Sequence, residues 1–130
     1  MRKLLLDTNA YTRLFRGDTN VLEALGRADT VFMSVFVLGE LYAGFKGGKK
    51  ETENRNQLDE FLRRPTVRIL IATRETSDIF GTLKDRLKKS GTPTPINDVW
   101  LAAHAAESGS HLLTYDTHFA NVPGILLWQQ

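Results

Sequence analysis

The sequence predicts an α/β fold, a three-layer α/β/α sandwich around a mostly parallel five-stranded sheet. Short apolar runs typical of buried strands alternate with helical patterns along the whole chain. Such alternation is typical of a parallel sheet with helices on both faces. The chain has 130 residues, 42% of them hydrophobic, which is enough for one hydrophobic core. We therefore expect one domain over residues 1–130.

The first third of the chain predicts two strands, at residues 3–6 and 30–33, and three helices, at residues 9–15, 20–27 and 35–45. Tyr11, Leu14 and Phe15 recur on one side of the first helix, which makes it amphipathic. Ser34 is a typical N-cap for the third helix. Apolar residues surround that third helix, so we expect burial on more than one side, with Glu40 inside.

The middle third predicts a polar loop, a third strand and a long helix, at residues 45–56, 67–71 and 75–89. Glycine and charged residues fill the loop, which is therefore the expected mobile element. A helix after the loop must end before Pro65, because proline cannot continue a helix. The long helix is amphipathic, since Ile79, Leu83 and Leu87 recur at four-residue spacing.

The last third predicts an alanine-rich helix followed by two strands, at residues 111–114 and 124–128. A proline-stiffened turn at residues 92–95 leads into the helix, which begins near Asn97 and Asp98. Pro123 and Gly124 form the turn that separates the two strands. These elements complete the five predicted strands.

Four acidic residues stand where a parallel α/β fold would gather them, namely Asp7, Glu40, Asp98 and Asp116. Asp7 and Asp116 each follow a predicted strand, and open α/β sheets bind ligands beyond the carboxyl ends of their strands. Glu40 and Asp98 lie in helices that can lean over the same edge. At about 5 Å, each pair of carboxylates repels by about 3 kcal/mol at an effective dielectric constant near 20. A hard cation relieves this repulsion, and oxygen ligands favour Mg²⁺ or Mn²⁺.

Simpler interpretations of the same residues stay open. Asp7 and Asp98 each fit a helix N-terminus that needs no metal. Three polar residues beside the acids fit either supporting roles at the site or ordinary turns and caps, namely Asn9, Thr114 and Asn97. We interpret His104 and His118 as structural, because one lies in the alanine-rich helix and the other in a turn.

The charge distribution suits a polyanionic substrate. Lys and Arg number 17 against 15 Asp and Glu, and four of those acids belong to the expected site. The rest of the surface is therefore basic, which favours binding of phosphates. The candidate phosphate contacts are Lys46, Lys49, Lys50, Lys84, Arg86, Lys88 and Lys89. Ordinary solvated side chains are the alternative interpretation, and core packing is the expected role of Trp100.

Composition excludes several classes of protein. The chain has no cysteine, which excludes disulfides and thiolate zinc sites. Its N-terminal apolar run is too short for a signal-peptide core, and no later run is long enough to cross a bilayer. We expect a cytoplasmic protein with no membrane attachment.

Four short motifs occur together, DTN at residues 7–9, GEL at 39–41, NDVWLAA at 97–103 and LLTYDTHF at 112–119. In this order they resemble the PIN-domain ribonucleases, specifically the VapC-type toxins of toxin–antitoxin modules. The resemblance implies one metal-binding quartet of Asp7, Glu40, Asp98 and Asp116. It also implies supporting polar roles for Asn9 and Thr114, and a weaker one for Asn97.

The same resemblance implies an Mg²⁺- or Mn²⁺-dependent endoribonuclease that cuts single-stranded or looped RNA and is inhibited by a cognate antitoxin. It further implies a homodimer, or a heterotetramer or larger assembly with the antitoxin. Tyr11, Leu14 and Phe15 exceed what one short helix needs for the core, so we expect the antitoxin to bind around them.

The alternative within enzymes is a housekeeping PIN-type nuclease that processes RNA, or a DNA nuclease, without an antitoxin. A receiver-like signalling domain is disfavoured, because it needs an aspartate at the end of its third strand and a lysine at the end of its fifth. Here those strands end in TVRILIATR and ILLWQQ. A binding-only module is disfavoured because all four acids are present.

Overall fold

The structure is a computed structural model that describes residues 2–128, and a parallel sheet lies at its centre. The strands of this part of the chain are β1 (Lys3–Leu6), β2 (Thr30–Ser34), β3 (Val67–Leu70), β4 (His111–Leu113) and β5 (Leu126–Leu127). They form one five-stranded sheet in the order β3-β2-β1-β4-β5, with every neighbouring pair parallel. The predicted parallel α/β sheet is confirmed.

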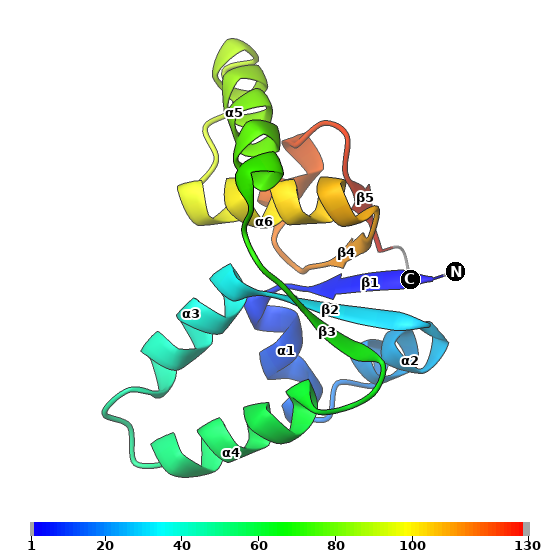
Figure 1. Cartoon of the computed structure of the whole chain (residues 1–130), viewed down its shortest axis with the longest axis vertical. Coiled ribbons are helices and arrows are strands. Elements are labelled where there is room, and N and C mark those ends of the chain that lie inside the picture. Colours follow the sequence, from blue (N-terminus) through cyan, green and yellow to red (C-terminus); the bar gives the residue numbers. More distant parts are fainter. Residues whose placement is uncertain (1, 129–130) are drawn as a thin grey trace.

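Helices cover both faces of this sheet (Figure 1). They are α1 (Thr8–Phe15), α2 (Thr19–Arg27), α3 (Val35–Phe45), α4 (Glu51–Leu62), α5 (Arg74–Lys89) and α6 (Ile96–Ser108), followed by a short 3₁₀ turn, η1 (Thr117–Asn121). In Figure 1, α1, α2 and α4 lie on one side of the sheet, and α6 lies on the other with α5 against its outer side. The three predicted layers are therefore present.

Short polar side chains set where the first helices begin. Asp7 accepts a hydrogen bond from the backbone N–H of Ala10 at the start of α1, and Asp18 caps α2 in the same way. Ser34 accepts from the N–H of Phe36 at the start of α3. Such caps satisfy backbone donors that the first helical turn leaves free.

The strand order reverses between β1 and β4. From β1 the chain adds β2 and β3 on one side, and then returns to place β4 and β5 on the other. The N–H of Asp7, just after β1, donates to the carbonyl of Leu113 at the end of β4, at 3.3 Å. In open α/β sheets this switch point is where ligands bind, because the loops after the two strands diverge and leave a crevice.

Two predicted element boundaries were wrong, and one short element was missed. The expected loop at residues 45–56 is confined to residues 46–50, because α4 already begins at Glu51. Glu51 and Glu53 lie in the first turn of α4, where the helix dipole favours acidic side chains. The fifth strand is two residues long rather than five, and η1 was not predicted.

The expectation that Glu40 lies inside a buried α3 was also wrong. Val37, Leu38 and Leu41 are buried, but Gly39 and Glu40 are exposed. The reason is its position, since α3 extends beyond the carboxyl end of β2 and away from the sheet (Figure 1). Glu40 therefore lies on an open side of the helix and needs no buried partner.

The side chains of α1 that suggested a surplus of apolar surface belong to the core. Tyr11 is 3% exposed and Leu14 7% exposed. The ring of Tyr11 packs edge-on against Phe61 of α4, with 5.5 Å between centroids, and Phe15 packs against the same ring at 5.9 Å. Tyr11 and Leu14 are thus not available to a partner, which corrects that part of the predicted antitoxin surface, whereas Phe15 is only half-buried.

His104 of α6 is buried between the ends of β2 and β3. Its Nδ1 lies 2.8 Å from the Ser34 hydroxyl and its Nε2 lies 3.1 Å from the carbonyl of Ile71. Because the carbonyl of Ile71 can only accept, Nε2–H donates to it, and in the neutral ring Nδ1 then accepts from the Ser34 hydroxyl. This neutral ring confirms the structural role expected for His104.

Acid should therefore destabilise the fold through His104. Burial lowers the pKa of this imidazole below its ordinary value of 6.5. As the pH falls below 6.5, the unfolded chain takes up a proton that the folded ring does not, so the free energy of unfolding decreases. The slope due to one proton is at most about 1.4 kcal/mol per pH unit.

The measurement is the free energy of unfolding in urea, recorded between pH 8 and pH 5 in about three steps of one pH unit. His104→Gln should be less stable at pH 8 but lose less stability on acidification than the wild type. His111→Gln, at an exposed histidine, is the control and should keep the wild-type slope. Equal slopes for wild type and His104→Gln would contradict the assignment.

Candidate metal centre

Asp7 lies at the switch point, and both of its carboxylate oxygens accept hydrogen bonds. Oδ1 accepts from the N–H of Ala10 at 2.7 Å, and Oδ2 accepts from the hydroxyl of Thr114 at 2.5 Å. Only 6% of the residue is exposed. A carboxylate has about four lone-pair positions, so each oxygen keeps one free for a cation.

Thr114 connects the two strand ends. Its hydroxyl donates to Asp7 after β1 and accepts from the N–H of Asp116 after β4, at 3.0 Å. The Asp116 carboxylate in turn accepts from the N–H of His118 at 2.9 Å and so begins η1. One threonine therefore holds two acidic residues from distant parts of the chain beside each other.

Asp98 reaches the same place from α6. It lies in the first turn of that helix, which begins after Pro95. Ligand atoms of Asp98, Asp116 and His118 all lie within 4.8 Å of one another. The His118 Nδ1 is 3.0 Å from the Asp116 carboxylate and 3.8 Å from that of Asp98. The carboxyl ends of β1 and β4 and the start of α6 thus converge on one cluster.

Glu40 approaches from α3 and is tied to the loop after β1. Its Oε1 accepts from the hydroxyl of Thr8 at 3.0 Å. It is exposed, but its charge is close enough to raise the pKa of both Asp7 and Asp98. The four predicted acids therefore share one electrostatic environment.

That environment disfavours negative charge. Burial raises the pKa of the Asp7 carboxyl, against the bonds from Thr114 and Ala10, and Asp116 and Glu40 raise it further. Burial also raises the pKa of Asp98, and the neighbouring acids add to this, whereas His118 lowers it. A group whose charged form is penalised in this way gains from a nearby cation.

The donor set fits a hard divalent ion. Within residues 2–128, no Lys or Arg forms an ion pair with any of the four acids, and His118 is the one basic side chain within 4.0 Å. Carboxylate oxygens are the ligands preferred by Mg²⁺ and Mn²⁺. The imidazole of His118 lies beside two of these acids, so it is a further candidate ligand in addition to the structural role predicted for it.

Asn9 and Asn97 do not join this network. Both are exposed, and in the part of the chain that the structure describes no hydrogen bond links either side chain to the acids. Thr8, which was not predicted as a site residue, makes the contact to Glu40 instead. The helical register explains this, because a hydroxyl directly after Asp7 faces α3 while the next residue faces solvent.

The aromatic side chains next to Asp98 and Asp116 pack against other side chains. Trp100 is stacked between Phe80 and Phe36, with centroid distances of 3.9 Å and 5.1 Å, so both faces of its ring are covered as expected for packing. The guanidinium of Arg13 lies 3.8 Å from the ring centroid of Tyr115, next to Asp116. Arg13 was not among the predicted residues.

The four candidate phosphate contacts on α5 do not share one face of that helix. Lys84 and Lys88, four residues apart, line one pocket of about 250 Å³ with Thr92 and Thr94, beside the start of α6. Arg86 points elsewhere on α5, and Lys89 is paired with Asp85 at 2.9 Å. At 100° per residue, four cations spread over six positions cannot share one face.

Comparison with known proteins identifies the fold. A sequence model of the PIN domain matches residues 4–125. The chain belongs to the PIN domain family. Ribonuclease VapC2 of Rickettsia felis is 31% identical over 128 residues, covering 95% of this chain and 94% of the relative. Ribonuclease VapC2 of Haemophilus influenzae is 31% identical over 118 residues, covering 88% and 86%.

A solved structure agrees over the same length. The crystal structure of VapBC2 from Rickettsia felis bound to a DNA fragment from their promoter matches with a TM-score of 0.83 at 29% identity, covering 97% of each chain. The PIN domain thus includes all four acids and the switch point between β1 and β4. In residues 2–128, no helix is long and apolar enough to cross a membrane.

Proposed function

We propose that this PIN domain is a metal-dependent endoribonuclease and the toxin of a toxin–antitoxin pair. One observation supports the proposal: Asp98 and Asp116 lie together at the topological switch point, Asp7 and Glu40 lie close enough to interact with them electrostatically, and no Lys or Arg in residues 2–128 forms an ion pair with any of the four. The relatives named Ribonuclease VapC support RNA as the substrate.

Asp7, Asp98 and Asp116 would hold Mg²⁺ or Mn²⁺, with Glu40 at the open side. When bound, such an ion polarises water and offsets the charge that develops on the scissile phosphate. Thr114 fixes the orientation of Asp7, and Thr8 holds Glu40 near the edge. His118 holds Asp116 through two contacts, from its backbone N–H and from its ring.

Removal of metal tests this proposal. Cleavage of RNA by the purified protein should be abolished by EDTA and restored by excess Mg²⁺ or Mn²⁺, while Ca²⁺, which prefers longer bonds and more ligands, should restore it poorly. Gel electrophoresis of the RNA products is the measurement. Equal cleavage in EDTA would contradict the metal-dependent mechanism.

We propose that basic side chains outside the cluster of Asp7, Glu40, Asp98 and Asp116 bind the RNA substrate. Lys84 and Lys88 line the pocket beside the start of α6, the helix whose first turn carries Asp98. Lys46, Lys49 and Lys50 are exposed in the loop between α3 and α4, at the end of α3 remote from the sheet (Figure 1). The first pair is therefore the better placed to hold RNA next to the cluster.

Replacing Lys84 and Lys88 together by Gln should weaken RNA binding and reduce its salt dependence. The slope of log affinity against log salt should fall by about one unit per lost phosphate contact. Fluorescence anisotropy with a labelled RNA in EDTA measures the slope without cleavage. The matched control is Arg86→Gln with Lys89→Gln, which removes the same charge from other faces of α5 and should leave the slope closer to wild type. Equal slopes for both pairs would exclude the pocket as an RNA contact.

An antitoxin is the proposed protein partner, because the structural relative is a VapBC complex. A homodimer, and a heterotetramer or larger assembly with the antitoxin, stay predictions. The alternative, a housekeeping nuclease without an antitoxin, predicts no small neighbouring reading frame and no growth arrest on expression.

A further inference from the structure

A pocket lies at the amino ends of the strands, opposite the carboxyl ends where the four acids gather. Its volume is about 430 Å³, within the range of about 300–1,000 Å³ typical of small-molecule sites. It lies where β1 and β4 begin and where α2 ends, and its walls include Lys3, His111 and Arg27. A strand advances about 3.3 Å per residue, so the backbones of Lys3 and Asp7 are roughly 13 Å apart.

The pocket lies at the amino ends of the strands, and part of its lining comes from one face of the sheet. Leu4 and His111 are register partners in β1 and β4, so their side chains leave the same face. His111 pairs with Leu126, and Trp128 follows two residues later, which places its indole on that face as well. The backbone N–H of Trp128 donates to the carbonyl of Leu112 at 2.9 Å and so holds the residue against β4.

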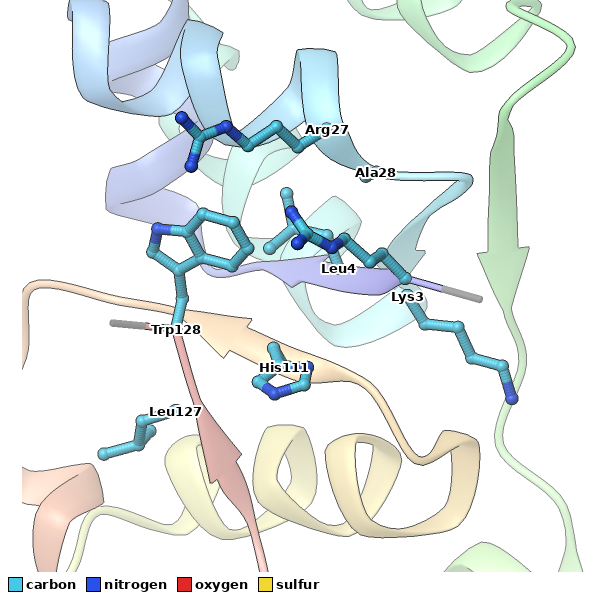
Figure 2. Close-up of a pocket in the computed structure, with 8 residues that line it drawn as sticks. Lys3, Leu4, Arg27, Ala28, His111, Leu127 and Trp128 are labelled. Carbon is cyan, nitrogen blue, oxygen red and sulfur yellow. The ribbon is translucent and has the colours of Figure 1, made fainter. Parts of the chain in front are cut away.

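An aromatic ring and several cations meet in this pocket. Figure 2 shows the indole of Trp128 extending from the end of β5 toward the end of α2, where Arg27 lies, with the imidazole of His111 below it. Trp128 is half-buried, so part of its ring remains open. The apolar side chains of Leu4 and Ala28 complete the wall.

The electrostatic character of the pocket is positive. Arg2, Lys3 and Arg27 line it, and no acidic residue does so within the described part of the chain. Arg27 is paired with Glu23 at 2.7 Å, but both are exposed, and such pairs are weak. Lys3 donates to the neutral carbonyl of Ser108, and Asp29 accepts from the backbone N–H of Arg2 rather than from its guanidinium.

We propose that this pocket binds a nucleoside phosphate, with the base against the indole of Trp128 and the phosphate at Arg2 and Arg27. Every base has a π-face that stacks on an aromatic side chain, and guanidinium groups match phosphate oxygens. The nucleoside phosphate is either a unit of an RNA strand that also reaches the acids, which rests on the proposed function, or a free nucleotide.

Trp128 itself reports the binding. The chain has two tryptophans, so Trp100→Phe leaves Trp128 as the single emitter. Titration with adenosine or uridine 5′-monophosphate in EDTA should quench its fluorescence to saturation, and inorganic phosphate should compete. In that background, Arg2→Gln with Arg27→Gln should weaken binding about tenfold or more. Arg63→Gln with Arg68→Gln, two exposed arginines outside the pocket, should not.

A binding experiment with RNA distinguishes the two sources of the ligand. The probe is a labelled single strand of about 12 nucleotides, a length within the usual site sizes of single-strand binders. If Arg2→Gln with Arg27→Gln weakens binding of this RNA as well as of the mononucleotide, the ligand is an RNA unit. If only mononucleotide binding weakens, the ligand is a free nucleotide.

Absence of saturable quenching at millimolar mononucleotide, or equal quenching in the pocket and control variants, would overturn the proposal. Trp128→Ala with RNA anisotropy gives a second measurement, and binding about tenfold weaker is expected if the site serves RNA. These titrations measure binding and need no cleavage. A chain without ribonuclease activity can therefore still bind the nucleotide, so failure of the ribonuclease proposal is distinguishable from failure of the nucleoside phosphate proposal.

Discussion

Replacing Asp7 by Asn should lower the rate of RNA cleavage about 10³-fold, a loss of about 4 kcal/mol of transition-state stabilisation. The expected size follows from the position of this carboxylate, which is the most buried of the four acids and lies at the switch point itself. Asn keeps the volume and removes the charge that would hold the cation. The measurement is the initial rate of RNA cleavage at saturating Mg²⁺.

The fold should survive this change. Asn caps helices about as well as Asp, so α1 keeps its N-terminal hydrogen bond to Ala10. Loss of a carboxylate whose pKa is raised by burial also removes a penalty from the metal-free protein. Asp7→Asn should therefore unfold at a temperature no lower than the wild type in EDTA, which separates loss of activity from loss of structure.

Asp18→Asn is the matched control, because Asp18 caps α2 as Asp7 caps α1. It should retain wild-type cleavage. If Asp7→Asn retained cleavage within about tenfold of Asp18→Asn, the acidic cluster would not be the catalytic centre.

The fold and the acidic cluster were accessible from the sequence because each depends on local signals. Apolar runs such as residues 3–6 predict buried strands, and parallel strands place whatever follows them at a common edge. Asp7 and Asp116 follow such strands directly, so their meeting required only the correct fold class. Thr114 joins them because it shares that edge.

The remaining contacts depend on three-dimensional packing. Glu40 was expected to be buried, since the composition of α3 does not reveal that the helix extends beyond the sheet. His118 was assigned to an ordinary turn, because nothing in a single sequence shows that η1 folds its ring back onto Asp116. The spread of Lys84, Arg86, Lys88 and Lys89 around α5 follows from helical geometry, but only the packing of α5 on α6 shows which pair lines a pocket.

The same limit applies to Tyr11 and Leu14. Their number suggested an apolar surface for a partner, whereas the structure places Phe61 of α4 against Tyr11. Long-range pairs of this kind, fifty residues apart in sequence, leave no periodic signal. Tyr11 and Leu14 are therefore core residues, and the charge of the four acids offers a partner a separate attraction.

Induction of the wild-type chain alone should arrest growth, and co-expression of a small neighbouring reading frame should relieve the arrest. Viable counts after induction, beside those of Asp7→Asn and Asp18→Asn, measure the effect. Growth arrest by the wild type and by Asp18→Asn but not by Asp7→Asn would assign toxicity to the acidic cluster.

Electrostatics predicts how the partner protein relieves the growth arrest. A positive side chain of the partner, most naturally Arg, would enter the cluster and pair with Asp7 or Asp98, whose burial disfavours an uncompensated charge. The partner would then compete with metal, so the purified complex should cleave RNA poorly and regain activity as Mg²⁺ is raised. Normal growth on strong induction of soluble wild type would contradict the toxin role and leave the nuclease proposal standing, because EDTA-sensitive cleavage needs only the four acids and a cation.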